Sequence, residues 1–262
     1  ERCVIPDDEA ARHLLQLRAA LLTLIGPVAA SHVTAGAMYR LALLDPDFSL
    51  VHITREGRGS SRTEGDVRHH DASLPPAHLT TIGDVLATSA ARTAVDLARV
   101  STYEAALVAT ESALNKELMT LRELREVMAY CNDWPGARDA GRVVAFASPY
   151  SESAGETLGR IAFDELGVPP PKQQVLIYDR YGLVARCDYF FEGRHTVGEF
   201  DGKLKYVGEN AEDDPLYKEK KREDRLREAG LEVFRIGYAE SLGKKPSVRR
   251  KAFGAFERAE GS

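Results

Sequence analysis

Carboxylates interrupt two strongly apolar segments in the last third of the chain. Asp188 lies within 187–191 and Glu199 lies within 197–201, where the neighbouring residues are typical of buried strands. Burying an acid without a partner costs several kcal/mol, so we expect these carboxylates to be paired or bound to a metal ion. On antiparallel neighbouring strands both acids can reach one ion, and such hard oxygen ligands suit Mg²⁺ or Mn²⁺. Asp201 follows Glu199 by two residues, so on a strand it faces the same side and is a further candidate ligand.

Two lysines, Lys203 and Lys205, follow these acids closely. A divalent ion beside an ammonium group suits phosphodiester hydrolysis, because the ion generates hydroxide and both charges stabilise the phosphorane-like transition state. The same acids can instead accept backbone hydrogen bonds or pair with a lysine, and the sequence leaves that structural alternative open.

A charged helix is expected at 216–229, ending at Gly230. Its segment 217–227 has six basic and three acidic residues, a net charge of +3. Lys218 and Arg222 are four residues apart and share a helix face, which can bind a DNA phosphate beside the acids. Ion pairing within a solvated helix is the alternative interpretation.

The elements around these residues predict an α+β protein. Residues 1–147 are expected to form a mostly helical region with one hairpin, made by strands near 50–54 and 66–70. Residues 148–241 are expected to follow the order α-β-β-β-α-β, a restriction-endonuclease-like mixed sheet flanked by helices. Its expected elements are a helix at 151–166, strands at 175–178, 183–191 and 196–201, the charged helix, and a strand at 232–236. Residues 242–262 are set apart as a basic tail.

The composition excludes several classes of protein. The 262 residues carry a net charge of −5, so a protein that uniformly coats nucleic acid is excluded and DNA contact requires a local basic patch. Three well-separated cysteines predict neither a disulfide framework nor a CxxC metal site, and no signal peptide or membrane span is expected, which favours the cytoplasm. The seven histidines are scattered, and adjacent His69 and His70 would face opposite sides of a strand, so no histidine metal site is predicted.

The C-terminal motifs together resemble the PD-(D/E)XK nuclease superfamily in its very-short-patch-repair-endonuclease-like branch. The motifs are SxxE at 153–156, Gln173 and Gln174, RCDY at 186–189, EFDGxxKY at 199–206, EKxRxDxLxxxG at 219–230 and VFRI at 233–236. The resemblance implies that Asp188 and Glu199 bind the metal and that Glu156 assists. The signature lysine is replaced by Asp201, so Lys203 or Lys205 would serve from a shifted position.

The N-terminal region resembles AbiEi-type antitoxins of type IV toxin–antitoxin systems. The matching motifs are ASHVTAGA at 30–37, VHITR at 51–55 and TSxxRTxxDLA at 88–98. Members usually begin with a winged-helix DNA-binding module. Residues 2–4 resemble the segment just after such a wing, so the module is expected to be absent here. The resemblance implies DNA and a cognate toxin as partners.

The residues and the two resemblances leave three hypotheses for the function. The first is a metal-dependent DNA endonuclease, active in phage defence or DNA repair. The second is a non-catalytic antitoxin or DNA-binding regulator on a degenerate nuclease fold, consistent with the missing signature lysine. The third and weaker one is a nuclease that acts on RNA. The sequence predicts neither the target sequence nor the oligomeric state.

Overall fold

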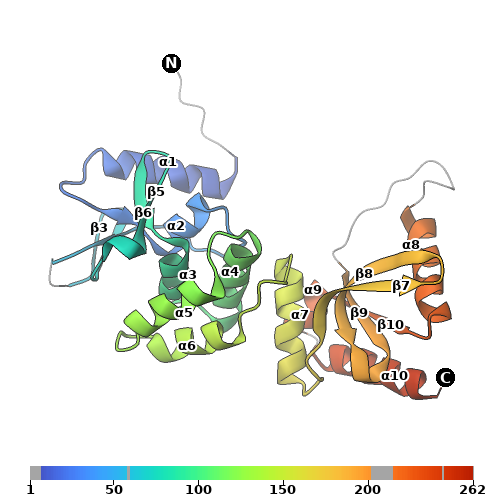
Figure 1. Ribbon diagram of the computed structural model, residues 1–262. Helices are drawn as coiled ribbons and strands as arrows, with labels where there is room; N and C mark the ends of the chain where they lie inside the picture. The colour runs from blue at the N-terminus through green and yellow to red at the C-terminus, as the bar shows by residue number, and fades with distance from the viewer. Residues whose placement is uncertain (1–6, 58–59, 202–214, 244, 262) are drawn as a thin grey trace. The chain divides into compact units, whose positions relative to one another are not determined.

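The chain is described by a computed structural model, which covers residues 7–57, 60–201, 215–243 and 245–261. It divides into two compact units, Glu1–Pro149 and Tyr150–Ser262, each with its own sheet and helices (Figure 1). The α+β class predicted from the sequence is confirmed, with a mixed sheet flanked by helices. None of the helices in these ranges is long and apolar enough to cross a bilayer.

The N-terminal unit contains a six-stranded sheet in the order β3-β4-β2-β1-β6-β5. Its elements are α1 (Glu9–Leu21), β1 (Ala29–Ala30), α2 (His32–Met38), β2 (Val51–Arg55), β3 (Arg62–Glu64), β4 (Val67–Asp71), the short 3₁₀ helix η1 (Pro76–His78), β5 (Leu79–Ile82), β6 (Val85–Thr88), α3 (Ala90–Ala98), α4 (Tyr103–Asn115), α5 (Leu121–Tyr130) and α6 (Ala137–Phe146). Helix α1 packs apolar residues such as Leu17 against Val51 and Ile53 of the sheet. Every residue of α3 is buried, so this helix forms the centre of the helical part of the unit.

The hairpin predicted between 50–54 and 66–70 is wrong. Strands β2 and β4 are neighbours, but they run parallel, with Thr54 opposite His70. The reason is the short strand β3, which the sequence pattern did not indicate. It makes the antiparallel hairpin with β4 through a tight turn, in which Gly65 has a φ of +55°. One extra reversal of the chain therefore brings β4 back beside β2 in the parallel direction.

The C-terminal unit has the predicted element order within residues 151–237. Its elements are α7 (Ala154–Glu165), β7 (Lys172–Asp179), β8 (Gly182–Phe191), the 3₁₀ helix η2 (Glu192–Arg194), β9 (Thr196–Asp201), α8 (Pro215–Glu228), β10 (Glu232–Gly237), α9 (Tyr238–Leu242) and α10 (Lys245–Glu260). The sheet order is β10-β9-β8-β7. Strands β7, β8 and β9 are antiparallel neighbours, and β10 runs parallel to β9.

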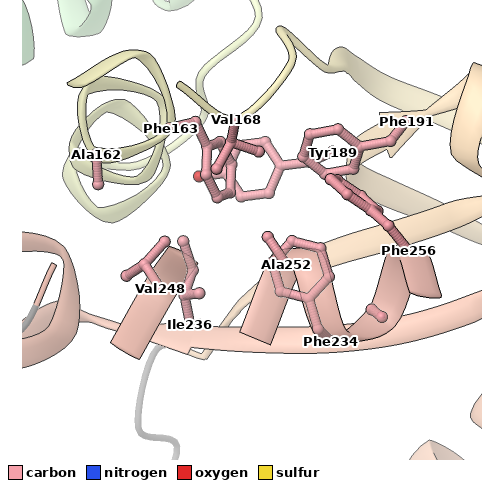
Figure 2. Packing of buried hydrophobic residues seen from close by; sticks show 11 residues of the cluster. Ala162, Phe163, Val168, Tyr189, Phe191, Phe234, Ile236, Val248, Ala252 and Phe256 are labelled. Atoms are coloured by element: carbon pink, nitrogen blue, oxygen red, sulfur yellow. The ribbon is translucent and has the colours of Figure 1, made fainter. Parts of the chain in front are cut away.

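Helices cover both faces of this sheet. On one face Phe163 of α7 meets Tyr189 of β8 edge to face, with ring centroids 5.0 Å apart, in a core that includes Phe234 (Figure 2). On the other face Leu226 of α8 packs on Cys187 and other sheet residues. A sheet buried on both faces positions residues along its strands rigidly, which is what a site at its centre requires.

The C-terminal segment 242–262 is not a tail, contrary to the sequence prediction. Most of it forms helix α10, in which Val248, Ala252 and Phe256 are buried in the same core as Phe163 (Figure 2). The tail was predicted from the basic residues at 249–251, which lie on the polar face of this helix. The apolar residues at spacings of four form its buried face.

Candidate functional site

In the sheet of the C-terminal unit, the backbone pairing of β8 with β9 ends at the two predicted acids. The antiparallel ladder ends at the pair Tyr189–Gly198, so the next pair in this register is Asp188 and Glu199. There Asp188 Oδ2 accepts a hydrogen bond of 2.9 Å from the backbone amide of Phe200. A carboxylate therefore takes the place of a main-chain acceptor, and the backbone pairing of the two strands ends where the two acids lie.

Strand β8 is distorted at the same point. Cys187 packs under α8 whereas Tyr189 packs under α7, although residues two apart on a regular strand face the same side. Directly across on β7, Gln174 has a φ of +53°, a left-handed conformation that costs a non-glycine residue about 1 kcal/mol or more. Such strain persists only where the surroundings impose it, and it concentrates at functional sites.

Glu156 is fixed at the start of α7 by local hydrogen bonds. Ser153 caps the helix by accepting from the Glu156 amide, and its hydroxyl donates to Glu156 Oε1 at 2.8 Å. Glu156 Oε2 accepts from the Glu152 amide at 2.9 Å and from Gln174 Nε2 at 2.8 Å. Both oxygens therefore already have protein donors, and Glu156 is mainly a positioning residue here.

Gln174 links Glu156 to Asp188, because its side chain also hydrogen-bonds Asp188. Burial raises the pKa of Glu156, of Asp188 and of Glu199, and the charge of Asp188 raises the pKa of the other two further. We call these three residues the acidic trio. The effect of Asp188 on the other two indicates that the three share one electrostatic environment, and clustered carboxylates with raised pKa values are typical of functional sites.

Glu199 has one paired oxygen and one unpaired oxygen. Its Oε2 accepts from Arg222 at 2.6 Å and lies 3.5 Å from Arg235 Nε, while its buried Oε1 has no hydrogen-bond partner in the part of the chain that the structure describes. The two arginines also bind Glu219, and Arg235 binds Glu223 at 2.8 Å. Arg227 also pairs with Glu223, at 2.5 Å, so three arginines and three glutamates balance one another within this network.

The remaining predicted site residues do not join the acidic trio as ligands. Arg222 was expected to bind DNA phosphate, but its guanidinium donates to Glu199 and Glu219 instead. Asp201 is exposed at the end of β9. Lys203 and Lys205 lie outside the described residues. Lys218 lies on α8, in the part of that helix whose side chains the structure does not describe.

The residues present fit a Mg²⁺ ion with two protein carboxylates better than one with three. Mg²⁺ is usually held by one or two carboxylates and keeps several waters or substrate oxygens. The unpaired Oε1 of Glu199, opposite Asp188 in register, supplies such a pair. Glu156 comes from a covering helix rather than from the strands, and in the described ranges no three acids bring their oxygens within 4.8 Å of one another.

Three histidines lie close enough together to bind one metal ion, although the sequence predicted no histidine metal site. His32, His52 and His70 of the N-terminal unit each bring a ligand atom within 4.8 Å of the other two. We call them the histidine cluster. In the sequence, the two-residue spacing of His52 and Thr54 indicates that both side chains face the same side of a strand. Only the parallel pairing of β2 with β4 brings His70 to that side, next to His52.

Comparison with known proteins gives the chain two distant relatives. It is 26% identical over 186 residues to the uncharacterized proteins MT2308 and Rv2248, from two strains of Mycobacterium tuberculosis, and the match covers 71% of this chain and 66% of each relative. The chain thus spans a little less than two thirds of the length of these proteins. No family model matches the chain, and no solved structure matches it.

Proposed function

We propose that the C-terminal unit is a metal-dependent nuclease domain that hydrolyses phosphodiester bonds in DNA. The observation that carries the proposal is the buried Oε1 of Glu199, which has no hydrogen-bond partner among the described residues and lies opposite Asp188 where the ladder of β8 and β9 ends. A buried acceptor without a donor is costly, and a cation is the natural partner for a group that is already negatively charged. The α-β-β-β-α-β order and the resemblance to PD-(D/E)XK nucleases support the same interpretation.

Mg²⁺ or Mn²⁺, when bound, would polarise the scissile phosphate and lower the pKa of a bound water. Asp188 and Glu199 would hold the ion. The Phe200 amide and Gln174 orient Asp188, and Arg222 holds Glu199 Oε2 so that Oε1 points elsewhere. These hydrogen bonds pre-organise the carboxylates, which is what a metal site requires of its supporting residues.

The positive charge that stabilises the transition state would come from Lys203 or Lys205. Lys218 would bind backbone phosphate, while Arg222 serves Glu199. Asp201, exposed at the end of β9, would orient a water or complete the ion's ligands. The cytoplasm, which the sequence favours, is a compartment in which such an enzyme would meet DNA.

The test is cleavage of supercoiled plasmid by the full chain with Mg²⁺ or Mn²⁺. We expect Asp188→Asn and Glu199→Gln each to lower the rate by about 100-fold or more, because each removes a charge that holds the ion. Glu192→Gln, at an exposed glutamate paired with Lys172 in the same unit, is the matched control and should cleave like the wild type. Equal cleavage by all four proteins would mean that the nuclease activity is a contaminant.

A non-catalytic role is the second candidate, and the pairing of Glu199 with Arg222 and Arg235 favours it. A carboxylate already held by two arginines can be a structural remnant of a degenerate site. In that case the chain would act as an antitoxin-like DNA-binding regulator or would neutralise a cognate toxin. DNA binding or toxin rescue that needs no divalent ion and persists in Asp188→Asn would support this role over the nuclease.

A further inference from the structure

The histidine cluster of the N-terminal unit is assembled from three separate elements. His32 is the first residue of α2, His52 lies on β2 and His70 lies on β4. Because Thr54 is opposite His70 in the parallel ladder and faces the same side as His52, both strand histidines lie on one face of the sheet. His70 Nε2 is 3.0 Å from His52 Nδ1, and the His32 ring stacks on His70 with centroids 3.7 Å apart.

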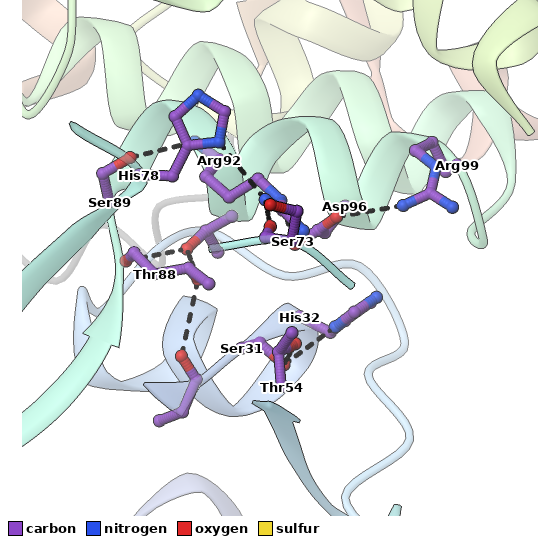
Figure 3. A network of polar contacts seen from close by, with 12 residues as sticks. Ser31, His32, Thr54, Ser73, His78, Thr88, Ser89, Arg92, Asp96 and Arg99 are labelled. Atoms are coloured by element: carbon purple, nitrogen blue, oxygen red, sulfur yellow. Dashed lines mark hydrogen bonds and ion pairs between the residues drawn. The ribbon is translucent and has the colours of Figure 1, made fainter. Parts of the chain in front are cut away.

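His32 has an unfavourable backbone conformation. Its φ is +50°, in the left-handed region that costs a non-glycine residue about 1 kcal/mol or more, and its side chain is buried. Its Nδ1 lies 3.0 Å from Ser31 Oγ, which also accepts from Thr54 Oγ1 at 2.8 Å, and Figure 3 shows Ser31 between these two residues. A hydrogen bond at Nδ1 fixes the ring and leaves Nε2 for another partner, as is typical of metal-bound histidines.

Burial around the three rings favours the neutral form of imidazole. Burial lowers the pKa of His52 to about 4 and that of His70 to about 2, and it lowers the pKa of His32 well below its usual value. A neutral imidazole is the form that coordinates a metal, so this direction agrees with the geometry of the cluster.

Room for a further ligand is present on two sides of the cluster. A cavity of about 450 Å³ is lined by His32, His52 and Asp47, and another of about 430 Å³ is lined by His32, His70 and polar residues. Arg92 and Arg99 line the second cavity and share Asp96, whose carboxylate lies 2.8 Å and 3.1 Å from them (Figure 3). Asp71 also lines this cavity, so its two guanidinium groups face two carboxylates, and the space suits water or another small polar ligand.

We propose that His32, His52 and His70 bind one divalent transition-metal ion of the zinc class, with an open coordination position for water or another small polar ligand. Three imidazole ligands suit Zn²⁺, and they are a poor match for the Mg²⁺ expected in the C-terminal unit. Binding replaces the hydrogen bond between His70 and His52, and those two nitrogens have to separate by about 0.3 Å to reach the spacing of tetrahedral ligands about 2.0 Å from zinc. This site is independent of the acidic trio.

The test uses the full chain, without a histidine tag, after treatment with a chelator. We expect equilibrium dialysis against ZnCl₂ to load one ion per chain, measured by elemental analysis. We expect CoCl₂ to give the strong visible absorption of a four-coordinate site. His52→Ala and His70→Ala should abolish both signals, and Ser31→Ala should weaken zinc binding by about 10- to 100-fold because His32 loses its orienting partner.

Two controls separate this site from others. His195→Asn changes an exposed histidine of the C-terminal unit, where asparagine tolerates the φ of +42°, and it should bind zinc like the wild type. Glu199→Gln should also bind normally, so failure of the nuclease proposal would leave this result unaffected. If His52→Ala does not fold, the cobalt spectrum of the wild type and zinc binding by Ser31→Ala decide the question. Absence of a stoichiometric ion in the wild type, or its retention in His70→Ala, would show that the cluster is only a hydrogen-bonded stack.

Discussion

Replacement of Arg222 by methionine tests how the acidic trio is stabilised. The methionine keeps most of the apolar stem of the side chain but removes the guanidinium that lies 2.6 Å from Glu199 Oε2. Glu199 would then remain buried, with Arg235 Nε at 3.5 Å as its remaining ion-pair partner among the described residues. Because an uncompensated buried charge is costly, we expect the variant to be less stable and its defect to depend on the ionisation of Glu199.

The magnitude follows from the exposure of the two side chains. Removing one partner of a fully buried pair costs about 3–5 kcal/mol. The Glu199 side chain is 9% exposed, but that of Arg222 is 29% exposed and Arg235 remains, so we expect about 2 kcal/mol for Arg222→Met. In the background of Glu199→Gln, which needs no counter-charge, the same change should cost less than about 1 kcal/mol.

The assay is a double-mutant cycle measured by urea unfolding of the full chain, with hydrogen exchange assigning the change to the C-terminal unit. Arg186→Met is the matched control, because Arg186 pairs with Glu152 at a site where both side chains are largely exposed, and it should cost less than about 1 kcal/mol. Lowering the pH should reduce the Arg222→Met defect, since a protonated Glu199 no longer needs the guanidinium. A defect that stays the same after Glu199→Gln would refute the reasoning.

Three further predictions concern stability. Gly159→Ala places a methyl group 2.4 Å from the Tyr189 hydroxyl and should cost about 1–3 kcal/mol in urea unfolding, whereas Gly193→Ala meets no atom within 4 Å and should cost almost nothing. Asp96→Asn leaves the 1%-exposed Arg92 without its carboxylate and should cost about 3–5 kcal/mol, and a change below about 1 kcal/mol would contradict the importance of this ion pair. Burial raises the pKa of Glu199 above its ordinary 4.5, so the stability it contributes is present below that value and is lost as the pH rises through the raised pKa. In chelator-containing buffer the wild type should therefore lose more stability than Glu199→Gln as the pH rises above 4.5, and parallel pH profiles of unfolding would exclude this linkage.

Local signals in the sequence were sufficient for the elements of the C-terminal sheet. Ser153 and Glu156 are three residues apart, a spacing typical of a helix N-terminus, and their hydrogen bonds close within one turn. The apolar residues around Asp188 and Glu199 likewise predicted β8 and β9. These features depend on neighbours along the chain, so sequence spacing alone specifies them.

Tertiary structure decided which groups the acids and histidines meet. Arg222 and Arg235 reach Glu199 from α8 and β10, 23 and 36 residues away in the chain, and no local spacing indicates that contact. The histidine cluster depends on β2 and β4 being parallel, which results from the reversal that β3 introduces and not from the pattern of either strand. The sequence by itself therefore determined where most helices and strands form and which acids interrupt them, because these depend on short-range periodicity and capping. Only the fold decided partners, burial and protonation, because these depend on residues that are distant in the chain and adjacent in space.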